Sequence, residues 1–173
     1  MGQCGLGKSY DLAQCFTPVD LSAGAPAAGD VINLRNAAGV DVILVSSAGA
    51  ANDIITLTFQ QADGIAGTPK ALCVDHYYQK LDTLLTTGTA WERVANGTAG
   101  TGITTIAGSA TSDDAQIIWV VPIEASQLDA GYDCVVVTSA QTAGAGSKFT
   151  SVMYLLRDLA HQRTPANLPN PLI

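Results

Sequence analysis

The clearest pattern along the chain is an alternation of apolar and polar residues with a period of two. In residues 53–61, Ile55, Leu57 and Phe59 alternate with threonine and glutamine. Successive side chains of a β-strand point to opposite faces, so this spacing predicts a strand with one buried and one solvated face. The same alternation recurs in residues 148–157. Both segments are therefore predicted to be strands.

Further strands are predicted where short runs of β-branched and aromatic residues lie between clusters of small, turn-forming residues. The complete set of predicted strands is 31–35, 40–46, 53–61, 71–79, 89–95, 116–123, 132–139 and 148–157. Residues 96–111 are mostly small residues and threonine, which predicts a long loop or a weak edge hairpin. Pro122 cannot donate to a strand ladder and predicts an edge or terminal position there. One helical turn is expected within residues 124–129.

The two ends of the chain lack this pattern. Residues 1–29 contain glycine, alanine and proline without a sustained period, and we expect an extended N-terminal arm with one short helix near Ser9–Cys15. Residues 159–173 are rich in proline, which does not easily join a packed sheet, and we expect a second extended arm there. The folded domain is thus predicted to span residues 30–158.

The number and spacing of these strands predict the fold class. About eight strands, separated by turn signals at intervals of roughly 8–12 residues, are typical of an all-β sandwich or jelly-roll-like domain. No helical pattern long enough for a β-α-β crossover lies between consecutive predicted strands, which excludes most doubly wound enzymes. A chain of 173 residues can bury enough apolar surface to fold without a disulfide or a metal.

Composition and charge favour a protein that works in an assembly. Apolar residues make up 47 % of the chain, charged residues make up 13 %, and the net charge is −7. A surface with so few charges tends to be covered by neighbouring subunits, which predicts a homo-oligomer. The basic residues form no stripe, so no nucleic-acid partner is expected.

The same reasoning predicts no membrane partner. Apolar runs such as residues 117–121 are too short to cross a bilayer. The first residues lack the charged start and apolar stretch of a secretory signal. We therefore expect a protein that is made and kept in a cytoplasm.

One stretch matches a phosphate-binding motif. Residues 2–9, GQCGLGKS, satisfy the spacing G-x-x-x-x-G-K-S of the P-loop. That loop needs a buried strand before it and a helix after it, so that backbone N–H groups point at the phosphate. Here the motif begins at residue 2, and Pro18 limits any following helix. We interpret it as a flexible glycine-rich arm and expect no nucleotide cofactor.

The four cysteines, at positions 4, 15, 73 and 134, contain no C-x-x-C pair. In a reducing cytoplasm they are expected to be free thiols, with Cys73 and Cys134 as small core residues. Two alternatives stay open. Cys4 and Cys15 can link after release from the cell, and Cys73 with His76 can contribute to a zinc site.

The remaining candidates for chemistry are isolated residues. Asp113 and Asp114 could bind calcium, but the spaced acidic loop with its closing glutamate is missing, so a solvated turn is expected. Glu92 and Glu124 are the only glutamates and could pair as in a glycosidase, although nothing in the sequence brings them together.

The two histidines complete the list of candidates. His76 is predicted to be a partly buried strand residue, and His161 is predicted to face solvent or a neighbouring subunit. No nucleophile motif such as G-x-S-x-G accompanies either of them. We therefore predict a protein that is not an enzyme and has no catalytic, cofactor-binding or metal-binding residues.

Several longer segments resemble a known kind of protein. Residues 16–34, 55–72, 115–140 and 151–169 are similar to segments of small virion proteins of tailed bacteriophages. The likeness rests on a run such as FQQAD followed by a glycine-threonine and a lysine-alanine-leucine, then IWVV, then LDAGYDC and a proline-rich end. It covers residues 16–173, and these motifs are structural. The cysteine-containing N-terminal residues lie outside it.

The resemblance implies a head-associated structural protein, with capsid decoration, or cement, as the specific function. It implies a homo-oligomer, often a trimer, that binds the major capsid protein on the phage head surface after assembly in the host cytoplasm. Two alternatives remain, a neck, connector or tail protein and a head-fibre or carbohydrate-binding module. A carbohydrate-binding module would need exposed aromatic residues on a groove, whereas Trp91 and Trp119 both lie in strand-like segments.

Overall fold

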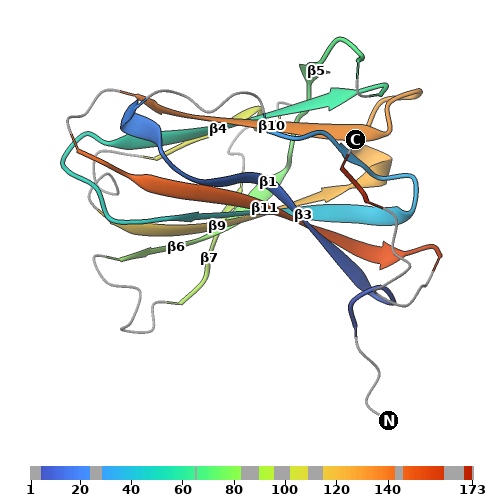
Figure 1. The fold of residues 1–173 in the computed structure, drawn as a ribbon, viewed down its shortest axis with the longest axis horizontal. Helices are drawn as coiled ribbons and strands as arrows, with labels where there is room; N and C mark the ends of the chain where they lie inside the picture. Colours follow the sequence, from blue (N-terminus) through green and yellow to red (C-terminus); the bar gives the residue numbers. More distant parts are fainter. Residues whose placement is uncertain are drawn as a thin grey trace.

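The structure is a computed structural model and describes residues 5–23, 29–64, 66–82, 90–95, 102–108, 115–142, 146–161 and 170–172. These residues form two antiparallel β-sheets that pack face to face, one above the other in Figure 1. Two stacked sheets with their apolar faces together are the architecture of a β-sandwich. The predicted all-β sandwich class is confirmed.

The large sheet has the strand order β1-β11-β3-β9-β6-β7. The small sheet has the order β2-β10-β4-β5, and β8 also pairs with β4. The strand bounds are β1 Tyr10–Asp20, β2 Ile32–Asn33, β3 Ala37–Ser46, β4 Ile54–Ala62, β5 Lys70–Ala71, β6 His76–Asp82, β7 Glu92–Ala95, β8 Thr105–Ala107, β9 Gln116–Glu124, β10 Cys134–Thr142 and β11 Phe149–Leu159.

The described residues form eleven strands, where the sequence predicts about eight for the whole chain. The additional strands are β1 at the N-terminal end and the short strands β5 and β8. The strand predicted over residues 71–79 is divided between β5 in the small sheet and β6 in the large sheet. The strand β8 is the only described part of residues 96–111 that lies in a sheet. The helical turn expected within residues 124–129 is confirmed as the 3-10 turn Ala125–Gln127.

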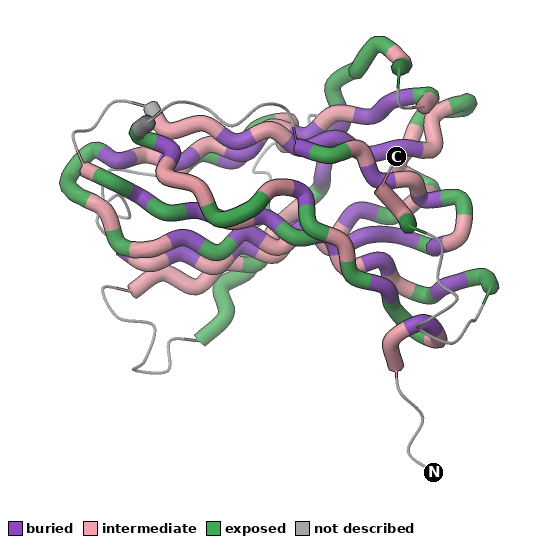
Figure 2. Tube along the Cα trace, viewed as in Figure 1, coloured by how far each residue is buried: buried purple, intermediate pink, exposed green. Residues whose placement is uncertain are grey.

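The inward faces of both sheets form one apolar core. On β4, Ile55, Leu57 and Phe59 are fully buried, as their alternation predicts. From the opposite sheet, Trp119 enters the core and makes an edge-to-face contact with Tyr77, at 6.0 Å between ring centroids. Figure 2 shows how buried and exposed residues alternate along the strands. The period of two therefore determines which side chains hold the sheets together.

The N-terminal segment differs from its prediction. Residues Tyr10–Asp20 form β1, which pairs with β11 at the edge of the large sheet, so the helix expected near Ser9–Cys15 is wrong. Cys15 is buried while Leu12 is exposed, which is the alternation of a strand. A helix of so few residues is marginal in water, whereas pairing with β11 satisfies the backbone and buries Cys15. Part of the expected arm thus lies within the sandwich.

Pro122 lies in an internal strand. The strand β9 runs between β3 and β6, although the proline predicts an edge or terminal position. The pairing with β6 ends at Val120, opposite Tyr78, while β3 continues with Asp41 opposite Pro122. The proline is therefore terminal with respect to β6 only.

The described end of the C-terminal segment contacts the small sheet. The backbone N–H of Asn33 donates a 3.1 Å hydrogen bond to the carbonyl oxygen of Pro171, and Leu172 forms a β-bridge with Ile32. Leu172 also packs against the core. Residues 162–169 of the predicted arm lie outside the described residues.

One carboxylate is fully buried between two loops. Asp53 accepts hydrogen bonds from the backbone N–H groups of Ala50 and Gly146 and from Nε2 of Gln141. Lys148 is buried to the same degree. These bonds connect the segment before β4 with the segment before β11. The buried Asp53 carboxylate therefore holds the two segments together through three hydrogen bonds.

Candidate functional site

The exposed large apolar side chains of the described residues all belong to the large sheet or to the residue next to it. Each of them is at least 36 % exposed, and the most exposed reaches 56 %. They are Tyr10, Leu12, Val45, Tyr78, Trp91, Phe149 and Met153. Scattered exposed apolar residues need no explanation, but a set confined to one sheet makes that sheet the candidate interaction surface.

The strand register brings these residues onto one surface. Directly opposed residues of neighbouring strands point to the same side of a sheet. Met153 lies opposite Ile43, Ile43 opposite Val120, and Val120 opposite Tyr78. We call this surface the outer face of the large sheet, and its apolar residues are Tyr10, Leu12, Ile43, Val45, Tyr78, Ile118, Val120, Phe149, Met153 and Leu155.

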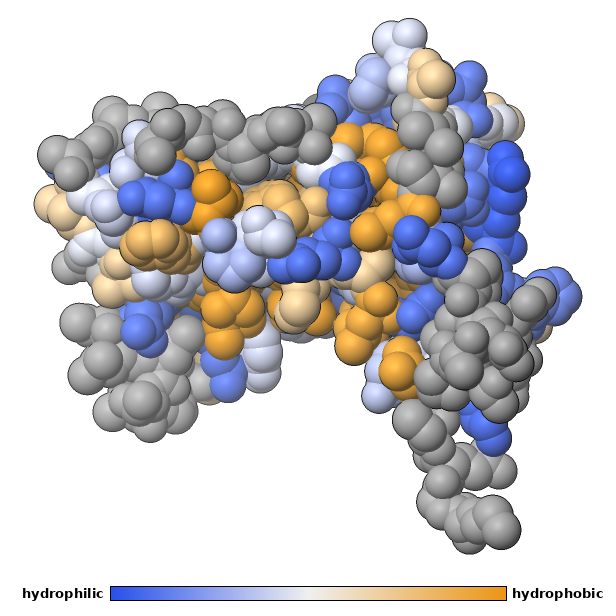
Figure 3. Space-filling view, viewed as in Figure 1, coloured by the Kyte–Doolittle hydropathy of each residue, from blue (hydrophilic) through white to orange (hydrophobic). Residues whose placement is uncertain are grey.

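The small sheet presents a different surface to solvent. On β4, the residues between the core positions are Thr56, Thr58 and Gln60. The hydroxyl oxygens of Thr58 and Thr105 lie 3.3 Å apart, and the Thr56 hydroxyl donates to the carbonyl oxygen of Ala140. Figure 3 shows apolar side chains over β1 and β11 in the middle of the molecule and hydrophilic ones at its right-hand end. Among the described residues, the exposed large apolar side chains therefore lie on the large sheet, whereas the apolar residues Ala62, Cys134 and Val136 on the outer side of the small sheet are buried.

A cluster of charged side chains lies at one end of the outer face. Nε of Arg157 forms an ion pair with Oδ1 of Asp41 at 2.7 Å, and its Nη2 donates a 2.8 Å hydrogen bond to Oε1 of Glu124. Burial raises the pKa of Asp41 although Arg157 acts to lower it. This carboxylate is therefore poorly solvated even on the free protein.

A shallow apolar hollow lies beside the charged cluster. Tyr78, Trp91 and Val120 line it. The Lys80 ammonium lies 4.9 Å from the centroid of the Trp91 ring, in a cation–π contact. A sugar would need an open aromatic face with polar groups around it, and Lys80 lies over one face of the ring. The hollow suits a large apolar side chain of a partner protein.

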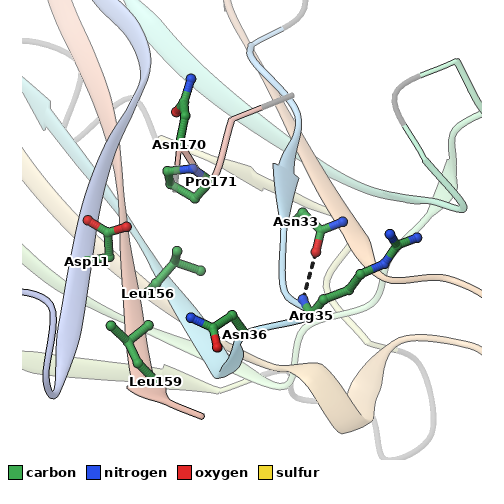
Figure 4. Close-up of a pocket in the computed structure, with 8 residues that line it drawn as sticks. All are labelled: Asp11, Asn33, Arg35, Asn36, Leu156, Leu159, Asn170 and Pro171. Atoms are coloured by element: carbon green, nitrogen blue, oxygen red, sulfur yellow. Dashed lines mark hydrogen bonds between the residues drawn. The ribbon is translucent and has the colours of Figure 1, made fainter. Parts of the chain in front are cut away.

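A second hollow lies where the edges of the two sheets meet (Figure 4). Its lining contains no serine, cysteine or histidine among the described residues. The polar groups are engaged locally, because Asp11 Oδ1 accepts from the N–H of Leu12, and Asn33 Oδ1 accepts from the N–H of Arg35. Arg35 also pairs with Asp133.

The motif that resembles a P-loop leads into a strand. Its residues 2–4 lie outside the described residues, and after Ser9 the chain enters β1 at Tyr10. The backbone N–H groups of Gly7, Lys8 and Ser9 bind carbonyl oxygens of Gly5 and Tyr10. These groups are therefore occupied within the turn, and no helix follows to direct them at a phosphate.

The cysteines are distributed differently from the prediction. Cys134 is buried as expected, but Cys73 is exposed and Cys15 is buried instead. Burial raises the pKa of Cys15 to about 11 and that of Cys134 to about 12. Both thiols stay protonated near neutral pH, and a protonated thiol is neither a nucleophile nor a zinc ligand. Cys4, and with it the alternative link to Cys15, lies outside the described residues.

The other candidate residues are not brought together. His76 is half-buried at the start of β6, as predicted, and His161 is exposed after β11. Glu92 accepts a 2.9 Å hydrogen bond from Gln79, while Glu124 binds Arg157 on the outer face. Asp113 and Asp114 lie outside the described residues.

Two kinds of site are absent from the described residues. No group of three or more histidine, cysteine or acidic side chains is placed so that it could hold a metal ion. Within the same residues, no helix has the length and apolar character needed to span a membrane.

The apolar outer face was not singled out from the sequence, although a signal for it exists. Residues 42–45 of β3 and 117–121 of β9 are apolar at both odd and even positions. Continuous apolar runs are typical of strands that are covered on both sides. The sandwich covers one side only, so the other side remains free for a partner.

Comparison of the chain with protein-family models, with curated proteins and with solved structures finds no match.

Proposed function

We propose that this chain is a structural protein of a tailed-bacteriophage virion, and specifically a decoration protein that binds and stabilises the assembled head. The observation that carries the proposal is the apolar outer face of a large, otherwise complete sheet. An exposed apolar face of this kind lowers the solubility of a protein unless a partner covers it. In a structural assembly, a neighbouring subunit covers such a face. The low charge content and the resemblance of residues 16–173 to small virion proteins support the same function.

In this function the protein acts as a clamp. It exists as a homo-oligomer and binds the major capsid protein where neighbouring capsomers meet, a site that exists only on the assembled shell. A ligand that binds only the assembled state stabilises that state by mass action. The acidic surface away from the outer face would favour a basic region of the shell. The side chains of this chain bind and position, and no bond is made or broken.

A neck or tail component is the second candidate, because it would use the same fold and the same apolar face. The number of copies in each particle distinguishes the two. A carbohydrate-binding module is less favoured, because Trp119 is buried in the core and the ring of Trp91 is covered in part by Lys80.

The proposal can be tested by adding purified protein to heads assembled without it. Binding should reach saturation at a fixed ratio to the shell protein, and the heads should resist heat better when saturated. Val45→Asp places a charge at an exposed position on the outer face, where the proposed homo-oligomer forms, and should weaken binding of the oligomer to heads roughly tenfold or more. Val45→Thr, which keeps the size of the side chain at the same position without adding a charge, is the matched control and should bind like the wild type. Heads that take up no wild-type protein would refute the proposal.

A further inference from the structure

The outer face is nearly neutral on an otherwise acidic molecule. Its charged residues are three basic and four acidic side chains, which gives −1 against −7 for the whole chain. They are Lys80, Arg93, Arg157, Asp20, Asp41, Asp82 and Glu124. Two copies of an acidic protein repel each other least through their least charged surface. The charge distribution therefore favours contact between copies through the outer face.

The charges on the outer face are also separated. Asp41 and Glu124 lie at one end, over β3 and β9, and share the single cation Arg157. Lys80 and Arg93 lie over β6 and β7, and Arg93 shares its side of the sheet with Tyr78. Among the described residues, neither Lys80 nor Arg93 forms an ion pair. Asp82 also lies on this side of β6, so the part over β6 and β7 has a net charge of +1, whereas Asp41, Glu124 and Arg157 together have a net charge of −1.

A surface with an acidic part and a basic part can complement itself. A two-fold symmetric contact uses the same surface of both copies. If one residue of the first copy contacts a second residue of the partner, then the second residue of the first copy contacts the first residue of the partner. The basic part of one copy then faces the acidic part of the other, twice in each dimer. The apolar residues between the two parts, such as Ile43 and Val120, meet at the centre of the contact. An apolar centre with charged groups at its rim is the usual anatomy of a protein interface.

We infer that a second copy of this chain covers the outer face. The two large sheets pack face to face about a two-fold axis, with Lys80 and Arg93 of each copy against Asp41 and Glu124 of the other. The poor solvation of Asp41 fits this contact, because a partner cation would stabilise its charged form. The hollow lined by Tyr78, Trp91 and Val120 would receive an apolar side chain of the partner.

This inference rests on the proposed function for its setting, since it specifies the contact by which the homo-oligomer forms. A two-fold contact closes a dimer by itself, and a trimer would require a different, head-to-tail contact. Self-association is measured on the isolated protein, whereas the proposed function is measured by binding to heads. Failure of one therefore does not imply failure of the other.

Charge reversal tests the pairing in solution. The wild-type protein should sediment as a dimer at micromolar concentration. In the double variant Lys80→Glu, Arg93→Glu, the part over β6 and β7 becomes acidic and faces the acidic part of the other copy, twice in each dimer. In Glu124→Lys, the cluster around Arg157 becomes net basic and faces the basic part of the other copy, again twice. Each variant alone should dimerise at least tenfold more weakly, which sedimentation equilibrium measures as a dissociation constant. An equal mixture of the two variants should restore the dimer, because opposite charges then face each other at both pairings.

Arg35→Glu is the matched control, because it reverses an exposed charge beside Asp133, away from the outer face, and should leave the dimer intact. Circular dichroism shows whether each variant is folded. A wild-type protein that stays monomeric on the order of 100 μM would overturn the inference. An undiminished dimer in the double variant would do so too. A mixture that remains monomeric would show that these charges do not pair across a two-fold axis.

Discussion

Val137→Asp is expected to leave no folded protein at room temperature, whereas Thr138→Asp, one residue further on, is expected to fold. The Val137 side chain is fully buried in the main core, in β10, which pairs with β2 and β4. Burying a carboxylate without a partner costs several kcal/mol, a large part of the roughly 5–15 kcal/mol that stabilises a typical domain. Soluble yield and the far-ultraviolet circular dichroism spectrum measure the outcome.

Thr138 is the appropriate control because it differs from Val137 mainly in the direction of its side chain. It is half-buried on the solvent side of the small sheet, so a charge there keeps access to water. Val136 would be a poor control, since it is also buried, against Ala62 and Cys134. A Val137→Asp protein that melts within a few degrees of the wild type would mean that the register of β10 is wrong.

Trp119→Ala is expected to destabilise the protein by about 3–5 kcal/mol, the usual cost of removing a large aromatic side chain from a core. Trp119 is 1 % exposed and packs edge-to-face against Tyr77. Within the described part of the chain its Nε1 has no hydrogen-bond partner, so the substitution removes packing alone. Urea unfolding followed by circular dichroism gives the change in the free energy of unfolding.

The second tryptophan provides the comparison. Trp91 is 49 % exposed at the edge of the outer face. Trp91→Ala should lower the free energy of unfolding of the monomer by less than about 1 kcal/mol, as for most surface substitutions. If the two variants lose similar stability, the assignment of Trp119 to the core and Trp91 to the binding surface is incorrect.

The sequence predicts the strands whose two faces differ. Ile55, Leu57 and Phe59 alternate with polar residues, and this alternation alone identifies both β4 and its core side. The turn at Ala125–Gln127 follows from local composition in the same way. Such features depend on neighbouring residues along the chain, so they can be recognised without knowledge of the fold.

Features that depend on distant partners could not be predicted. The strands β2 and β3 follow each other closely, yet β2 pairs with β10 and β3 with β11 and β9, in different sheets. Residues Tyr10–Asp20 become a strand because β11 is available beside them. Cys15 is buried for the same reason, whereas Cys73 is exposed in the segment between β5 and β6, whose course residue type alone does not determine.

The candidate surface could be predicted only in part. The runs around Ile43 and Val120 are apolar at every position, which indicates that both sides of these strands are covered. The sequence does not say which side packs on the second sheet and which side meets a partner. The separation of Lys80 and Arg93 from Asp41 and Glu124 appears only once the strand register is known. That register is set by long-range pairing.

The copy number of this protein in purified virions tests the proposed function most directly. Quantitative mass spectrometry against the major shell protein gives this number. A decoration protein should be present in a number comparable to that of the shell protein. A few copies per particle would contradict decoration and assign the protein to the neck or tail, and its absence from virions would contradict a structural role altogether.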